Sequence, residues 1–224
     1  MTLTLYTYDW LPEFPRGFVR DMRVRWVIEE LGRSYVVKPL PASPKSDGHL
    51  RMQPFGQVPI IKDQELTLFE SGAILLHLGA GSDLIPNGRE AEITQWLFAA
   101  LNTVEVASAP WLNMKLALKI PQLFGPPPAA DVVDHARAML ETRLSALDRI
   151  MAERDWLTED FSVADIAMVD VLRVIHAEDG LGSHDNLTGY VQRGTDRPAF
   201  RKAMKDHMAH WKAADARREV EEAS

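Results

Sequence analysis

The stretch Gln53–Leu78, QPFGQVPIIKDQELTLFESGAILLHL, decides the fold of this chain, because a strand, a turn and a helix start can be read from it. Pro59 precedes the β-branched pair Ile60 and Ile61, and proline is tolerated in a sheet at the first residue of a strand, at an edge or at a bulge. The sequence therefore predicts a short strand that begins after Pro59. The bond between Val58 and Pro59 can be trans or cis, and a cis bond would present the backbone of Val58 to an extended peptide.

The second half of the same stretch predicts a hairpin and then a helix. Polar residues 63–65 separate the new strand from a second apolar run at 66–69, which is the spacing of a hairpin with a short loop. The apolar character of 73–78 predicts a mostly buried helix, so Glu70 and Ser71 would lie at its N-terminus, where backbone N–H groups and the helix dipole favour an anion. The alternative is that Ser71 caps its own helix and Glu70 interacts with the dipole.

The residues before this stretch predict a strand, a helix and a second strand. Residues 2–8 alternate and are rich in β-formers, and 17–31 carry one apolar helical face that ends at a glycine. Residues 34–40 predict a second strand, parallel to the first if the helix between them is a crossover. Residues 41–50 are polar and are expected to form a surface loop. The order βαβ followed by ββα is that of a thioredoxin-like domain.

The chain beyond residue 89 predicts helices and no convincing strand. Apolar stripes predict helices over 90–119, broken or kinked near Pro110, and over 130–153, with a proline-containing loop at 120–128. The run FSVADI at 161–166 has the arrangement of a capping box with a hydrophobic staple. The predicted fold class is therefore α/β plus all-α, with a thioredoxin-like domain at 1–80, a linker at 81–88 and an all-helical domain at 89–224.

Composition excludes several classes of function. The chain has 224 residues, 46% of them hydrophobic, so it can bury a core and is neither disordered nor fibrous. A net charge of −7 provides no overall basic field for nucleic acid or anionic lipid. We find no membrane span and no signal peptide, and therefore expect a cytoplasmic protein. The absence of cysteine removes disulfides, cysteine-bound zinc and a protein thiol nucleophile.

The run PFGQVP, followed by ESGAIL, resembles the glutathione-binding segment of the glutathione S-transferase family, of the cytosolic type. FSVADI resembles the folding signature of that family's helical domain, and 190–193 and 197–200 resemble its C-terminal pattern. The resemblance implies that Val58 with Pro59 pairs with the cysteinyl part of glutathione, that Glu70 and Ser71 hold the γ-glutamyl end, and that Gln57 lies beside them. It also implies a homodimer and a small hydrophobic co-substrate, as in detoxification.

The residue that would activate the thiol is not given by the family pattern. The connection 9–17 is longer than usual and contains no serine, and positions 18–21, where a catalytic serine or cysteine would stand, are Phe, Val, Arg and Asp. Four candidates remain, first Tyr8 and then Thr7 at the strand exit, with Arg16 and Arg20 as a positive environment for a thiolate. The alternative for the arginines at 16, 20, 23 and 25 is a solvated or interface-facing set.

Three further points stay open at this stage. Residues 10, 11, 14, 111, 112 and 114 could wall a pocket for an apolar electrophile, or belong to the core. Asp170 is either a paired, half-buried acid or a residue facing a cleft, and the histidine spacing predicts no metal site. The leading hypothesis is a transferase that adds or substitutes glutathione thiolate on an electrophilic carbon. The alternatives are a non-catalytic glutathione- or protein-binding module, or a glutathione-dependent isomerase, dehalogenase or peroxidase.

Overall fold

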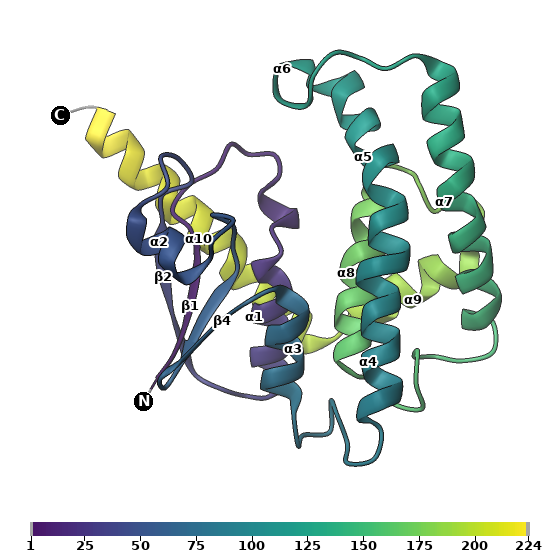
Figure 1. Ribbon diagram of the computed structural model, residues 1–224, viewed down its shortest axis with the longest axis horizontal. Coiled ribbons are helices and arrows are strands. Elements are labelled where there is room, and N and C mark those ends of the chain that lie inside the picture. Colours follow the sequence, from purple (N-terminus) through teal and green to yellow (C-terminus); the bar gives the residue numbers. More distant parts are fainter. Residues whose placement is uncertain (1, 223–224) are drawn as a thin grey trace. The chain divides into compact units, whose positions relative to one another are not determined.

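The computed structural model describes residues 2–222, and these form two compact units (Figure 1). The first unit combines the described residues up to Ser82 with those from Asp196 onward, and the second runs from Asp83 to Thr195. The predicted fold class, a thioredoxin-like domain with an all-helical domain, is confirmed. The second unit ends before the C-terminal helix, which the sequence had grouped with the helical region 89–224.

The first unit is built on a four-stranded mixed sheet with the order β2-β1-β3-β4. β1 (Leu3–Tyr8) pairs in parallel with β2 (Tyr35–Leu40) and antiparallel with β3 (Ile60–Asp63), and β3 forms the predicted hairpin with β4 (Leu66–Phe69). Because β1 is central, its side chains alternate between a fully buried face and a half-buried face. The carboxyl ends of β1 and β2 and the start of β3 therefore lie along one edge of the sheet.

Two helices of the first unit pack against each other, α1 (Asp21–Glu30) and α3 (Ser71–Gly79). The helix predicted at 17–31 is divided in the structure, because a single turn, η1 (Arg16–Phe18), is followed by extended backbone at Val19. α1 is buried over its first eight residues, including both of its arginines. α1 is therefore buried on its polar positions as well as on the apolar face that the sequence pattern predicts.

The segment 41–50 is not the continuous surface loop that its polarity predicts. Asp47–Met52 form a short helix, α2, and the Ser46 hydroxyl caps it by accepting a hydrogen bond from the backbone N–H of His49 at 3.1 Å. A serine followed by an acid satisfies and stabilises the start of a helix even where the residues are polar. The loop interpretation is wrong, because the Ser46 N-cap stabilises a short helix that the polar composition of the segment does not indicate.

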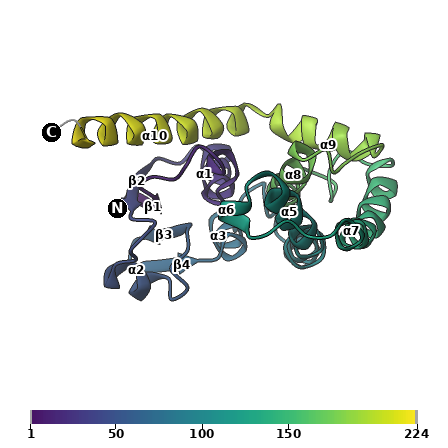
Figure 2. The same cartoon turned by 90° about the horizontal axis from the view of Figure 1, so that it is seen from above.

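The C-terminal helix α10 (Pro198–Glu222) packs along α1 within the first unit, as Figures 1 and 2 show. The ring of Phe200 lies 4.9 Å from that of Trp26, edge to face, and Arg197 forms two hydrogen bonds with the Glu30 carboxylate at 2.6 and 2.8 Å. Lys202 forms an ion pair with Glu29 at 2.6 Å. These contacts explain why residues from Asp196 onward belong to the unit that contains the sheet.

The second unit is all-helical over its described residues. Its elements are α4 (Glu90–Phe98), η2 (Ala99–Glu105), α5 (Val106–Lys119), α6 (Pro121–Phe124), α7 (Ala130–Met151), α8 (Val163–Ala177) and α9 (Asp185–Thr195). The helix does not break at Pro110, which lies inside α5; the irregularity is a π-helical segment, η2, that ends at Glu105 before α5 begins. One turn, α6, interrupts the loop expected at 120–128, because proline is well tolerated at a first helical position.

The predicted capping box at the start of α8 is present. The Ser162 hydroxyl accepts a hydrogen bond from the Ala164 backbone N–H at 3.2 Å, and the Asp165 carboxylate accepts one from the Ser162 backbone N–H at 2.9 Å. Asp165 also accepts hydrogen bonds from the Leu157 N–H at 2.9 Å and the Tyr190 hydroxyl at 2.7 Å. Burial raises the pKa of Asp165 although these donors oppose the effect. Asp170 is a buried acid paired with Arg173 at 2.8 Å. The first of its two alternative interpretations therefore holds.

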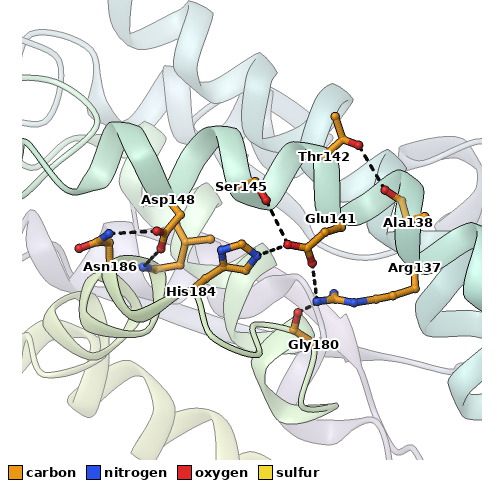
Figure 3. A network of polar contacts seen from close by, with 10 residues as sticks. Arg137, Ala138, Glu141, Thr142, Ser145, Asp148, Gly180, His184 and Asn186 are labelled. Atoms are coloured by element: carbon orange, nitrogen blue, oxygen red, sulfur yellow. Dashed lines mark hydrogen bonds and ion pairs between the residues drawn. The ribbon is translucent and has the colours of Figure 1, made fainter.

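A polar network ties α7 to the connection between α8 and α9, as Figure 3 shows. The Glu141 carboxylate accepts hydrogen bonds from His184 at 2.7 Å, Ser145 at 3.0 Å and Arg137 at 2.7 Å, and Arg137 also donates to the Gly180 carbonyl at 2.6 Å. These charged groups are satisfied by one another, so they stabilise the unit. In the part of the chain that the structure describes, no helix is long and apolar enough to cross a membrane.

Candidate functional site

The predicted binding residues gather at one edge of the sheet because of the strand order. β1 pairs with β3 so that Tyr6 lies opposite Ile60, and continuing this register leads from Tyr8 toward Val58. Ile60 in turn lies opposite Phe69, the last residue of β4, so Glu70 follows at the same edge. The end of β1, the start of β3 and the end of β4 thus come together.

The Val58–Pro59 peptide bond is cis, which was the alternative that the sequence left open. Two buried side chains hold the loop before it. His49 of α2 donates a hydrogen bond from Nε2 to the Gln57 carbonyl at 2.9 Å, and the side-chain oxygen of Gln53 accepts from the backbone N–H groups of Phe55 and Gln57 at 2.6 and 3.2 Å. The backbone at Val58 is therefore fixed from behind, while Gln57 is exposed.

The Glu70-Ser71 pair begins α3 as predicted. Glu70 has a positive φ of 69° and an exposed side chain, and neither residue forms a side-chain capping bond. Instead, the Ser71 hydroxyl accepts a hydrogen bond from the buried guanidinium of Arg23 at 3.2 Å. The alternative that Ser71 caps its own helix is thus not what the structure shows. The α3 N-terminus combines backbone N–H groups, a hydroxyl and a nearby cation, which suits a carboxylate.

Tyr8 and Thr7 lie on opposite faces of β1, as strand alternation requires. Thr7 is fully buried and its hydroxyl has no hydrogen-bond partner. Tyr8 is half-buried, its hydroxyl donates to the Gly56 carbonyl at 3.3 Å, and the ammonium of Lys45 lies 4.3 Å from the centre of its ring. Of the two hydroxyls, that of Tyr8 is the one at the loop that precedes Pro59.

The arginines of the first helix region are mostly buried, contrary to the solvated set that was one alternative. Arg16, Arg23 and Arg25 are 8%, 2% and 2% exposed, and only Arg20 is exposed to solvent. Arg16 is bound to Asp215 of α10 by two hydrogen bonds at 2.5 and 2.6 Å. The side chain of Arg16 is therefore already paired with a carboxylate.

The long loop after β1 is attached to α10 at several points. The indole N–H of Trp10 donates to Asp215 at 2.9 Å, beside Arg16, and these two donors hold the pKa of Asp215 at about 2. His207 donates to the Arg16 carbonyl at 2.6 Å, and His210 donates to the Tyr8 carbonyl at 2.8 Å. The C-terminal helix thus fixes both the strand exit and the loop beyond it.

A buried ion pair lies in the first turns of α1, the helix that follows this loop. Arg25 Nε lies 2.8 Å from Asp21 Oδ2, and both side chains are almost completely buried. His207 Nδ1 lies 3.4 Å from the same carboxylate oxygen. Burial alone would raise the pKa of Asp21, but His207 and Arg25 outweigh burial and lower it to about 2.

The residues considered as walls of an apolar pocket come from both units. Trp111 is 5% exposed and lies in the core of the helical unit, and Met114 lines a cavity of 550 Å³ in the same unit. Trp10 and Leu11 line a different cavity in the first unit. Among the side chains that the structure describes, no group of three or more histidines and acids has an arrangement that could hold a metal ion.

Several of these residues were missed in the sequence. Arg23, Lys45, His49 and Asp215 carry no motif of their own, and their proximity to the loop depends on pairings between distant segments. A usable local signal existed for His49, since the Ser46 cap places it in the first turn of a helix. Asp215 is 199 residues from its partner, so no local pattern could have identified it.

The fold is that of a thioredoxin-like domain with an added helical domain. Comparison with known proteins gives the family. Residues 2–80 match the family model described as glutathione S-transferase, N-terminal domain. A probable glutathione S-transferase of Oryza sativa subsp. japonica is 33% identical over 152 residues, 64% of this chain and 70% of that protein. Glutathione S-transferase 1 of Zea mays is 30% identical over 192 residues, 80% of this chain and 88% of that protein.

Solved structures share the fold. A glutathione transferase from Pseudomonas putida, crystallised with one glutathione disulfide per subunit, superposes with a TM-score of 0.74 at 21% identity and covers 91% of each chain. The chain belongs to the glutathione S-transferase family, which confirms the resemblance seen in its sequence, and it is a glutathione transferase.

Proposed function

We propose that the edge formed by Tyr8, Val58–Pro59 and Glu70-Ser71 binds glutathione, and that the bound thiolate attacks the electrophilic carbon of a small co-substrate. The observation that carries the proposal is the meeting of three binding elements at one sheet edge: a cis-proline loop, a helix N-terminus and a tyrosine hydroxyl. Glutathione is an extended tripeptide with a backbone, a carboxylate at each end and a thiol. The cis-proline loop suits its backbone, the helix N-terminus suits one carboxylate, and the hydroxyl suits the thiol.

The binding roles follow from the chemistry of each element. The backbone of Val58 pairs with the cysteinyl residue, with Gln57 beside it. Ser71 and the N–H groups of α3 bind the γ-glutamyl carboxylate, supported by Arg23 behind Ser71, and the carboxylate of Glu70 faces the amino group. At the other end, Lys45 is a cation beside the loop and suits the glycyl carboxylate.

Tyr8 is proposed as the group that activates the thiol. A hydroxyl that donates a hydrogen bond to sulfur favours the thiolate, and the present acceptor of Tyr8, the Gly56 carbonyl at 3.3 Å, is distant enough to be exchanged for a ligand atom. Thr7 is fully buried, and Arg16 is paired with Asp215. Arg20, which is exposed, remains as a second source of positive charge near the thiolate.

The proposed partners are glutathione, a small hydrophobic electrophile and a second copy of this chain. Both units carry exposed apolar side chains that a homodimer would cover. Phe55 is 71% exposed in the first unit, and Val106 is 61% exposed beside the cavity of the helical unit. An association of the first unit of one subunit with the helical unit of its partner would bury both. A solution mass equal to one 25.2 kDa chain would contradict it.

An ultraviolet titration of bound glutathione tests the catalytic role. We expect the thiol to ionise below its solution pKa of about 8.5 in the parent protein and to return toward that value in Tyr8→Phe. The same variant should lose about 10- to 100-fold in kcat/KM, since a hydrogen bond to a charged group contributes about 1.5–3 kcal/mol.

Tyr6→Phe is the matched control, because Tyr6 lies two residues before Tyr8 on the same face of β1. It should keep both the thiol pKa and the rate. Glutathione binding with no change in thiol pKa in the parent protein would instead identify a non-catalytic binding module. Normal activity in Tyr8→Phe would exclude Tyr8 as the activating group.

A further inference from the structure

The short helix α2 and the residue that ends it supply two buried side chains to the loop before the cis-proline. His49 is 1% exposed and Gln53 is 2% exposed. Together they bond three backbone groups of the loop, which are the N–H of Phe55 and the N–H and carbonyl of Gln57. Gln57 directly precedes Val58, the residue that is proposed to pair with the cysteinyl part of glutathione. The buried side chains therefore lie immediately behind a proposed contact with the ligand.

His49 is itself held by the start of α2. The Ser46 hydroxyl accepts a hydrogen bond from the His49 backbone N–H at 3.1 Å, and the backbone N–H of Gln53 donates to the His49 carbonyl at 2.9 Å. Both backbone groups of His49 are thus bonded, and its ring is buried. A side chain that is fixed in advance loses less entropy when the group it supports binds a ligand. His49 is therefore suited to hold the loop in one position.

The contact between His49 and Gln57 also determines where the ring carries its proton. A carbonyl oxygen only accepts, so Nε2 of His49 donates to the Gln57 carbonyl across 2.9 Å. The other ring nitrogen, Nδ1, is buried and has no hydrogen-bond partner among the residues that the structure describes. A proton on Nδ1 as well would make the ring a buried cation without a partner, which is costly. The geometry therefore favours the neutral ring with its proton on Nε2.

The hydrogen bond to the Gln57 carbonyl sets the direction of the next N–H group. The carbonyl of Gln57 and the N–H of Val58 belong to the same peptide unit, and this unit is trans. A trans peptide is planar, so its carbonyl and its N–H point in opposite directions. Because His49 holds the carbonyl on the side of α2, the Val58 N–H is aimed away from α2.

We propose that His49 is a positioning residue for glutathione, because it aims the Val58 N–H at the cysteinyl residue by holding the other side of the same peptide. The inference rests on the proposed function and gives α2 a part in that site. His49 lies behind the loop, so it acts on binding and not on the chemical step. A contact that is equally strong in the bound ground state and in the transition state changes KM and leaves kcat unaltered.

Two substitutions of His49 in the full chain test the inference. His49→Leu keeps the bulk of the side chain and removes the donor, whereas His49→Gln keeps an N–H donor on a side chain of similar reach. In the leucine variant we expect the Kd and the KM for glutathione to rise about tenfold, because the Gln57 carbonyl loses its donor. In the glutamine variant both should stay within about threefold of the parent values, since the hydrogen bond is kept. In both variants kcat and the pKa of the bound thiol should be unchanged.

γ-Glutamylcysteine, which lacks the glycine of glutathione, locates the effect within the ligand. Its affinity should fall by the same factor in His49→Leu, since it keeps the cysteinyl residue that pairs with Val58. A loss confined to glutathione would place the effect at the glycyl end and would overturn the inference. An unchanged KM in the leucine variant, a fall in kcat at unchanged KM, or equal losses in the leucine and glutamine variants would also overturn it.

His77→Leu is the matched control, because His77 is a histidine of the same unit that bonds the Asp63 carboxylate at 3.1 Å and not the loop. It should leave the KM for glutathione unchanged. Nitrogen NMR of the parent protein, labelled in histidine, needs no leucine variant and therefore covers the case in which that variant does not fold. It should show His49 with a protonated Nε2 and a bare Nδ1, and a proton on Nδ1 in place of Nε2 would contradict the proposed hydrogen bond.

Failure of the proposed function gives a different result. If the parent protein binds no glutathione, the proposed function fails, and amide hydrogen exchange in the free protein decides the part of His49. Faster exchange over residues 55–58 in His49→Leu, with the parent rate restored in His49→Gln, would support its hold on the loop. Equal exchange in the parent protein and in His49→Leu would overturn it.

Discussion

Replacing Asp21 by Asn should destabilise the first unit strongly, because it removes one partner of a buried ion pair. Asp21 is fully buried, and its Oδ2 lies 2.8 Å from Nε of Arg25, which is 2% exposed. Asparagine has nearly the same size but no charge, so the guanidinium would be left buried and uncompensated. Breaking a buried pair in this way costs about 3–5 kcal/mol. For a chain of this length the midpoint of thermal unfolding should fall by roughly 6–20 °C.

The charge argument predicts a partial rescue. If the uncompensated guanidinium causes the loss of stability, the double variant Asp21→Asn, Arg25→Met should lose less free energy of unfolding than the sum of the two single variants. Buried ion pairs can often be replaced by apolar side chains. We expect a coupling of about 1–3 kcal/mol between two groups in direct contact. Additive effects would show that the loss comes from packing and not from charge.

The acid dependence of stability gives a second measure of the same group. The folded protein holds the pKa of Asp21 at about 2, against an ordinary 3.8, so its contribution is fully present above about pH 5 and is lost as the pH falls from about 4 to 2. This lowering corresponds to a contribution of roughly 2 kcal/mol to the free energy of unfolding, at about 1.4 kcal/mol for each pKa unit. Asp21→Asn should remove that part of the acid destabilisation.

Urea unfolding followed by tryptophan fluorescence, at pH 7 and between pH 5 and 3, measures both effects. Asp131→Asn is the matched control, because Asp131 also lies in the first turn of a helix but is exposed. Asp131→Asn should lower the free energy of unfolding by no more than about 1 kcal/mol, the range of a helix-dipole interaction. An Asp21→Asn protein with the parent's midpoint at pH 7, or with the parent's acid dependence, would refute the reasoning.

Three further predictions concern packing, capping and the α10 attachment. Gly194→Ala should lower the free energy of unfolding by about 1–3 kcal/mol, because the added Cβ would lie 2.7 Å from a methyl group of Val169. Gly189→Ala in the same helix is the control, since its Cβ would meet nothing within 4 Å and the change should be neutral or stabilising. Urea midpoints measure both variants, and equal effects would contradict the packing argument. Asp165→Ala should cost roughly 3–5 kcal/mol, since several buried donors lose their acceptor, and a calorimetric midpoint within a degree of the parent's would contradict it. Asp215→Asn should release the loop after β1 and lower kcat/KM for glutathione conjugation, with hydrogen exchange increased in that loop; unchanged exchange there would argue against the attachment.

The predictable part of the fold depends on signals that lie within a few residues of each other. The proline before β3, the polar turn of the hairpin and the Ser162–Asp165 box each determine backbone conformation through local sterics or local hydrogen bonds. These signals survive in any tertiary setting, so they could be read without a structure. The segment 41–50 shows the limit of this approach, because its polar composition obscured the capping serine of α2.

The candidate site was predictable only where it follows the family pattern. Val58, Pro59, Glu70 and Ser71 lie within one short stretch, and the hairpin between them brings both ends to the same edge. Arg23 and Lys45 come from other elements and reach this edge through pairings that no local pattern shows. The sequence also allowed Arg16 to be a free cation, because its partner Asp215 is far away in the chain.

The sequence by itself determined the four strands of the first unit, the stretch that resembles the family's glutathione-binding segment, and the absence of cysteine, since these depend on residue identity and short-range geometry. The tertiary structure decided that α10 belongs with the sheet, that three of the four arginines near α1 are buried, and that Asp215 of α10 holds the loop after β1. Those features arise from contacts between segments nearly two hundred residues apart, and only the folded chain brings them together.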